Sequence, residues 1–233
     1  IDHMAKQINI KNPVNLTTIQ NFLSQRPEIK YFEGKNYKNN SNKVLFIGKG
    51  HYIEKIDIDH ANFIKKPIPV NDWYNSLNIY DEIVDKKLQE NINTRDIIEK
   101  RLINSLNSPN QAHLIYQKIA EVYAQKYDLS NFKKALEEIA FANAFLRPAI
   151  NIKSLEEKNI NSIDINYTLG YVDFLITNLN PAKIFLLHNH IDFIKNYIQS
   201  NYQNQNINID RVSCPRKGWN NSQKGGQKLL LLL

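Results

Sequence analysis

Residues Lys43 to Tyr52 read KVLFIGKGHY, and this stretch decides the fold class. Its apolar run, Val44 to Ile47, is typical of a strand that helices cover on both faces. Gly48 and Gly50 follow, and glycine there allows a positive φ and a close approach of a ligand to the backbone. We therefore expect a glycine-rich turn that carries His51, at the edge of the sheet where α/β proteins bind ligands. The alternative is an ordinary strand-to-loop turn with an exposed histidine.

The composition is that of a globular protein with a basic surface. Hydrophobic residues make up 42% of the 233 residues, and the formal net charge is +7. That charge favours an anionic partner, DNA or another nucleic acid first, although a modest excess of lysine also occurs in proteins without one. The only cysteine, Cys214, excludes an intrachain disulfide and is typical of a reducing compartment. The chain contains no apolar stretch of about 18 residues, so we expect a cytoplasmic protein that does not bind membranes.

The domain organisation is expected to be simple. Residues 1–3 look like a cloning remnant before Met4, which is the only methionine. Residues 4–233 are predicted to form a single α/β domain with a helical insertion at about 74–138. That insertion is long enough to carry a surface for a partner.

Predicted strands alternate with predicted helices along the chain. The strands are expected at 44–47, 139–145, 183–187 and 207–212. Helices are expected at 15–25, 72–88, 94–127 with an interruption at 107–109, 130–137, 162–179, 189–202 and from about 221. This alternation predicts a three-layer α/β/α fold with a central, mostly parallel four-stranded sheet. The ends of the strands should then meet at one edge, bringing together residues 48–52, 143–147, 188–190 and 213–219.

Four segments, taken in their order along the chain, carry a family resemblance. They are VLFIGKGHY at 44–52, IAFANAFLRP at 139–148, NPAKIFLLHN at 180–189 and RVSCPRKGWNN at 211–221. This order resembles that of the uracil-DNA glycosylase superfamily. The first segment is similar to the family's strand and water-activating loop, and the second to its strand that ends in an asparagine. The third is similar to its proline turn and strand, and the fourth to its late His-Pro-Ser loop, which enters the DNA minor groove.

The resemblance implies roles for particular residues. Asn143 would read the edge of a flipped base, and Tyr52 or Phe63 would stack on that base. The residues implied in nucleic-acid binding are Lys49, Arg147, Ser213, Arg216, Lys217 and Trp219. Each role has a structural alternative: Asn143 could bond loop backbone, Arg147 could face solvent, and Trp219 could pack beneath its loop.

The chain departs from the family pattern at both catalytic segments. Family members commonly place Asp, Asn or Glu in the first loop, whereas this loop reads Gly48-Lys49-Gly50-His51. His51 is therefore the expected substitute that polarises the attacking water. The late loop lacks its histidine, and Arg211 or Arg216 could instead stabilise the departing base with a permanent positive charge.

Several functions stay open at this point. The chain could excise a damaged base, or it could be a binding-only descendant of the glycosylase fold. It could also be a nucleotide- or metabolite-binding enzyme on a doubly wound fold, or an interaction module. No cofactor is expected, and no metal, because His188 and His190 have the spacing of metal ligands but lack an evident third ligand.

Overall fold

The computed structural model describes residues 13–53, 69–75, 92–104, 114–150, 160–215 and 218–233. The chain divides into two compact units. The first consists of residues 1–30, 49–93 and 143–178, and the second of residues 31–48, 94–142 and 179–233. The expected single domain over residues 4–233 stays a prediction.

The paired strands of the second unit establish the α/β class. The strands are β1 (Phe32–Glu33), β2 (Val44–Ile53), β3 (Ala140–Ile150), β4 (Lys183–Leu186) and β5 (Asn208–Arg211). They form a sheet in the order β1-β3-β2-β4-β5, in which β2, β4 and β5 run parallel and β1 runs antiparallel to β3. The described sheet is thus mixed and five-stranded, whereas the sequence predicted four strands. The fifth, β1, is two residues long and therefore shows no hydrophobic period.

The register of the parallel strands is continued by their flanking residues. Phe46 lies opposite Phe185, which in turn lies opposite Asp210. Beyond the ends of β4 and β5, Leu187 N–H donates to the carbonyl of Ile47 and Val212 N–H to that of Leu186. The chain therefore leaves β4 and β5 at the same level of the sheet.

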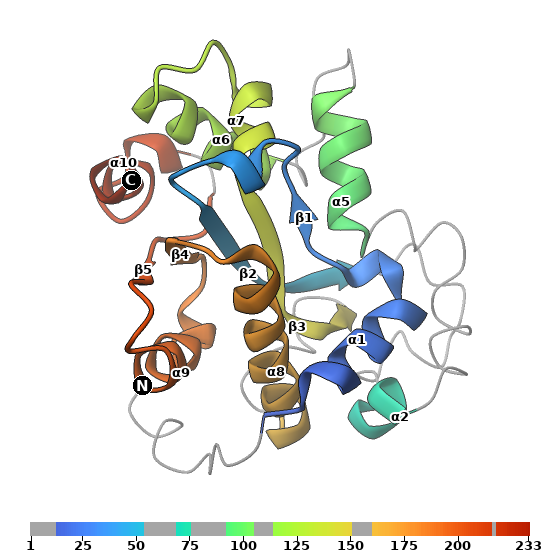
Figure 1. Cartoon of the computed structure of the whole chain (residues 1–233). Helices are drawn as coiled ribbons and strands as arrows, with labels where there is room; N and C mark the ends of the chain where they lie inside the picture. Colours follow the sequence, from blue (N-terminus) through green and yellow to red (C-terminus); the bar gives the residue numbers. More distant parts are fainter. Residues whose placement is uncertain (1–12, 54–68, 76–91, 105–113, 151–159, 216–217) are drawn as a thin grey trace. The chain divides into compact units, whose positions relative to one another are not determined.

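The core of the second unit is built on one face of these strands. Phe46 stacks between Phe141 and Phe185, with ring centroids 5.2 and 5.4 Å away. Apolar side chains of α6 (Leu114–Lys126), α7 (Phe132–Glu138) and α10 (Gly226–Leu232) pack into the same cluster. Figure 1 shows α6 beside both α7 and α10. The other described helices of this unit are α5 (Thr94–Asp96), the π-helical segment 97–103 and α9 (Phe193–Asn201).

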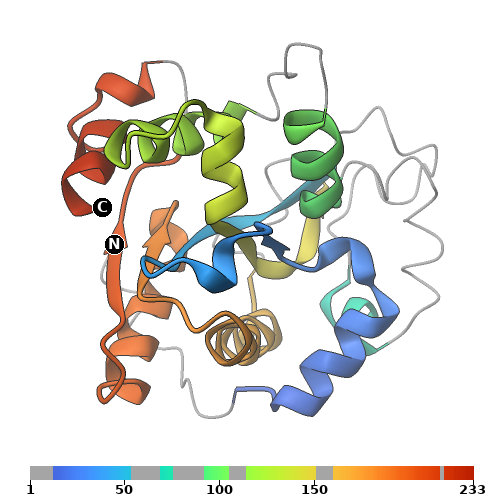
Figure 2. The same ribbon diagram turned by 45° about the horizontal axis from the view of Figure 1, so that its top comes forward.

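The first unit contains three described α-helices around an aromatic cluster. They are α1 (Leu16–Gln25), α2 (Val70–Asn75) and α8 (Ser162–Leu179, apart from its last residue). Asn15 caps α1 as predicted, because its side chain accepts a hydrogen bond from Thr18 N–H at 2.9 Å. Tyr74 of α2 lies against both Phe22 of α1 and Tyr167 of α8. Figure 2 shows α1 in blue with α2 in teal beside it.

Two strand ends differ from the sequence prediction. The strand β2 does not turn at Gly48 and Gly50 but continues to Ile53. Both glycines are extended, and Gly218 is the only described glycine with a positive φ. Likewise β3 does not end at Arg147-Pro148 but continues to Ile150. The residues whose burial is described, 49–51 in β2 and 148–149 in β3, are buried, which favours a continued strand over a solvent-exposed turn.

The predicted helices are confirmed in part. The helix at 162–179 has the predicted bounds, whereas Asn131, not Ser130, caps α7. The expected helix at 72–88 is described only to Asn75, and the expected helix start at Ser108-Pro109 lies outside the described residues. Among the described helices, none combines the length and apolar character needed to cross a bilayer.

The central position of Phe46 gives a test of the core. Phe46→Ala should lower the free energy of unfolding by about 3–5 kcal/mol, because it leaves a cavity between two stacked rings. Urea denaturation of the whole chain measures this. Leu231→Ala is the control, since Leu231 is 83% exposed and its loss should change little. Equal effects of the two variants would contradict the assigned core.

Candidate functional site

His51 and Asn143 form a side-chain pair in the first unit. Asn143 Nδ2 lies 3.3 Å from His51 Nδ1 and 3.4 Å from Nε2, so the amide can donate to the unprotonated ring nitrogen. The structure therefore brings together two residues that the sequence placed in one site. In this arrangement the Asn143 amide faces an imidazole, not the edge of a base.

Burial keeps the His51 imidazole neutral. Its side chain is 5% exposed, and desolvation lowers its pKa from 6.5 to about 4, although a backbone hydrogen bond with Ile92 opposes the shift. At neutral pH the ring carries no charge. One of its nitrogens can then accept a hydrogen bond and the other can donate one. A base of such low pKa takes a proton poorly, so His51 is suited to orienting a polar group more than to removing a proton.

Arg147 is fully buried in the same unit and makes an ion pair with Asp164. Its Nε donates to Oδ1 of Asp164 at 3.0 Å and its Nη2 to Oδ2 at 2.7 Å, with both side chains at 0% exposure. The Tyr74 hydroxyl donates to the same carboxylate at 3.0 Å, and burial followed by the Asp164 charge raises the pKa of Tyr74. This guanidinium joins β3 to α8, so Arg147 does not face solvent, which was its structural alternative. Its predicted contact with a DNA phosphate stays a prediction.

A basic hollow lies at the carboxyl ends of β4 and β5 in the second unit. Its volume is about 530 Å³. The residues that line it are Leu187, His188, Asn189, Arg211, Val212, Ser213, Cys214, Lys224 and Lys228. Three of them are permanent cations and none is a carboxylate. The arrangement can hold an anionic group of a ligand, and we call it the carboxyl-end hollow.

The charged side chains of the carboxyl-end hollow are arranged by local contacts. Arg211 Nη1 donates to Asp192 Oδ2 at 2.6 Å, and both side chains are about half exposed. Lys228 Nζ donates to the carbonyl of Arg211 at 2.7 Å. Lys224 is exposed, and its backbone carbonyl accepts from Ser213 N–H. Among the described residues, Arg211 thus has a carboxylate partner, whereas Lys224 and Lys228 have none.

Trp219 is held beneath the late loop. Its indole N–H donates to the carbonyl of Ser213 at 2.5 Å, and the residue is 1% exposed. Gly225 lies against the ring, where a Cβ would approach the indole to 2.5 Å. The ring therefore packs beneath its loop, as the structural alternative for Trp219 expected. Its contact with DNA stays a prediction.

The remaining predicted residues fall into two groups. Lys49 is 8% exposed, so little of it is available to a phosphate. Phe63, Arg216, Lys217 and the side chain of Tyr52 lie outside the described residues. The structure describes His51, Asn143 and Arg147 in the first unit and Arg211 and Ser213 in the second, so their predicted convergence stays a prediction.

Three residues of these clusters escaped the sequence analysis. Lys224 and Lys228 line the carboxyl-end hollow, and their nearness to the 211–219 loop was the available signal. Asp164 was missed as the partner of Arg147. It lies four residues before Thr168, and both are fully buried beside an apolar stripe, which is the spacing of a buried polar face on a helix.

The histidines after β4 pack against each other. The ring centroids of His188 and His190 are 4.6 Å apart. His188 Nδ1 accepts a hydrogen bond from the backbone N–H of His190 at 3.2 Å. This hydrogen bond uses one ring nitrogen of His188 for the start of a short helical turn. No group of three His, Cys, Asp or Glu side chains in the described ranges could hold a metal ion.

Comparisons with protein-family models, curated proteins and solved structures found no match to this chain. The functional argument therefore depends on the residues and their geometry.

The lowered pKa of His51 predicts a pH dependence of stability. Between pH 6.5 and about 4 the unfolded chain binds a proton that the folded chain does not. Stability should therefore fall as the pH drops through this window, by up to about 3 kcal/mol. Urea denaturation at several pH values measures the loss. His51→Gln should remove this contribution, and an unchanged pH profile in that variant would contradict the burial of a neutral His51.

The Arg147–Asp164 pair makes a second prediction. Arg147→Met should cost about 3–5 kcal/mol, because it leaves the Asp164 carboxylate buried without a cation, with only the Tyr74 hydroxyl and the Asn161 N–H as partners among the described residues. The double variant Arg147→Met/Asp164→Leu should recover part of that loss, since no buried charge remains. Denaturant unfolding of the single and double variants measures the coupling. Wild-type stability in Arg147→Met, together with weaker DNA binding, would instead restore the phosphate-contact hypothesis.

Proposed function

We propose that this protein binds nucleic acid and that the carboxyl-end hollow makes its phosphate contacts. The observation that carries the proposal is the lining of that hollow. Arg211, Lys224 and Lys228 face it without a lining carboxylate. Cations at such a site attract the phosphate backbone, which supplies most of the affinity in nucleic-acid binding.

The strand order supports this position. The chain moves from β2 to β3 on one side and then to β4 and β5 on the other, so the order reverses at β2. In open α/β sheets, ligands bind outside the carboxyl ends of the strands near such a reversal. Leu187 and His188, which follow β4, line the carboxyl-end hollow. The net charge of +7 supports an anionic partner independently.

The His51–Asn143 pair favours binding without base excision. A base-reading asparagine needs its amide free for the base, whereas Asn143 lies at hydrogen-bond distance from His51. A water-activating base also needs a higher pKa than about 4 to work well at neutral pH. We therefore propose a glycosylase-like protein whose main activity is binding. Base excision, if an assay detects it, would be an additional activity.

A nucleotide is the second candidate ligand. The volume of about 530 Å³ lies in the range of small-molecule sites. A nucleotide would use the same cations for its phosphates, but its binding would not gain from additional chain length.

The proposal is tested by the binding of DNA as a function of salt. Fluorescence anisotropy with single- and double-stranded oligonucleotides should show affinity that falls steeply as salt rises. Lys224→Ala/Lys228→Ala should weaken binding about tenfold or more at low salt and reduce the salt slope by about 1 to 2. Lys195→Ala is the matched control, because this lysine of α9 does not line the hollow.

Three other outcomes decide between the alternatives. Absence of DNA and RNA binding at low salt contradicts the proposal. Equal affinity for a mononucleotide and for a long strand supports the nucleotide instead. Cleavage of strands that carry uracil or hypoxanthine, lost in Asn143→Ala, would establish excision.

A further inference from the structure

A second hollow lies at the opposite ends of the parallel strands. It has a volume of about 540 Å³ and is formed by the segments before β2, β4 and β5. Its lining residues are Lys38, Asn39, Asn40, Ser41, Lys43, Asn180, Pro181, Ala182, Gln205, Asn206 and Ile207. We call it the amino-end hollow, and all of its residues belong to the second unit.

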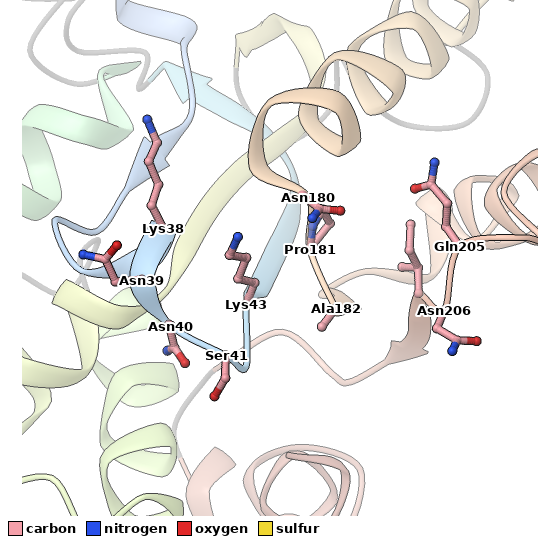
Figure 3. Close-up of a pocket in the computed structure, with 11 residues that line it drawn as sticks. Lys38, Asn39, Asn40, Ser41, Lys43, Asn180, Pro181, Ala182, Gln205 and Asn206 are labelled. Atoms are coloured by element: carbon pink, nitrogen blue, oxygen red, sulfur yellow. The ribbon is translucent and has the colours of Figure 1, made fainter.

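Most side chains that line the amino-end hollow are amides or lysines. Five of its side chains are amides and two are lysines, and no carboxylate lines it. One lysine of the hollow has an acidic neighbour outside it, because Glu33 Oε1 is 3.9 Å from Lys38 Nζ. Figure 3 shows the Lys38 and Lys43 amino groups pointing toward the same side as the Gln205 amide. A side-chain amide offers a donor and an acceptor together, while a lysine offers only donors and a positive charge.

The backbone around the amino-end hollow is held in place by the sheet. Ala182 N–H and Lys183 N–H both donate to the carbonyl of Lys43, and Asn208 N–H donates to that of Ala182. Asn40 is fixed from below, because its amide donates to the Tyr123 hydroxyl at 2.9 Å. These hydrogen bonds fix the backbone that carries the lining residues, and we call this backbone the frame of the hollow.

The polar groups on this frame are available to a ligand. Within the described part of the chain, the side-chain amides of Asn39, Asn180 and Gln205 make no hydrogen bond to protein. Asn180 adopts a φ of 45°, a conformation that asparagine tolerates better than most residues. This backbone places its amide at the rim between α8 and β4, as Figure 3 shows.

We propose that the amino-end hollow binds a small polyhydroxylated anion of the sugar-phosphate class. The amides match hydroxyl groups, which both donate and accept hydrogen bonds. The lysines match the phosphate. The volume fits a ligand of that size. This site is separate from the carboxyl-end hollow, since the two share no lining residue.

The test is a titration of the whole protein with glucose 6-phosphate, followed by ¹H–¹⁵N NMR. Saturable shifts are expected at backbone amides of residues 38–43, 180, 182 and 205–207. Glucose and inorganic phosphate, each titrated alone, should bind at least tenfold more weakly, because each offers only one half of the recognised chemistry.

Two variants assign the binding to these side chains. Lys43→Met should weaken glucose 6-phosphate binding about tenfold, since one charged contact to phosphate is lost. Asn180→Gly removes an amide but tolerates the positive φ, so it should weaken binding without unfolding the protein. Lys224→Met is the control in the carboxyl-end hollow and should leave this binding unchanged.

Three outcomes would overturn the proposal. They are the absence of saturable shifts, binding of inorganic phosphate as tight as that of glucose 6-phosphate, and shifts confined to residues 187–189 and 211–214. Loss of DNA binding in Lys224→Ala/Lys228→Ala bears only on the carboxyl-end hollow, so the two proposals fail separately.

Discussion

The burial of Val44 to Ile47 is the constraint on which the rest of the structure depends. All four residues are at 0% exposure, although successive side chains of a strand point to opposite faces. Both faces therefore need cover, and the backbone needs hydrogen-bonding partners on both edges. The neighbours β3 and β4 supply those edges. Because β2 is central, the chain must place later strands on either side of it, and this creates the reversal in strand order.

The same constraint explains why the polar chemistry gathers at the strand ends. At Val44 to Ile47 the interior of the sheet is apolar, and the polar side chains buried farther along β2 and β3, such as His51 and Arg147, have hydrogen-bonding partners. The lysines and amides that line the two hollows lie outside the strands. The segments before β2, β4 and β5 form the amino-end hollow, and those after β4 and β5 contribute to the carboxyl-end hollow. Among the described residues, no carboxylate lines either hollow, in a chain whose net charge is +7. Both proposals of anion binding rest on this lining.

The sequence predicted features that follow from local patterns. The apolar run at 44–47 predicted a buried strand, Asn15 predicted a helix cap, and the stripe from Ile165 predicted α8. Positions set by tertiary packing were not predictable in this way. Glycine permits a turn but does not require one, so Gly48 and Gly50 stayed extended where burial favoured a strand. Asp164 lies 17 residues after Arg147 on another element, and no local period pairs the two. The lysines of α10 and its preceding turn follow the 211–219 loop closely in the sequence, but only the fold shows that they line the hollow.

The candidate site is shaped by which polar groups the protein buries. Arg147 was expected at the end of a strand, as a phosphate-binding arginine would be, but it lies within β3. Its full burial requires a carboxylate partner, and Asp164 provides it with two hydrogen bonds. Among the described residues, the partners of His51 are the Asn143 amide and the backbone of Ile92, so it avoids the cost of a buried charge without a counter-ion by staying neutral. Neither side chain can then present a positive charge to a ligand. The charge for anion binding must come from side chains that keep contact with water, and in the second unit these are the lysines at the ends of the parallel strands. A residue's place at a strand end is therefore a weak guide to its role, and its burial decides whether it serves the core or a ligand.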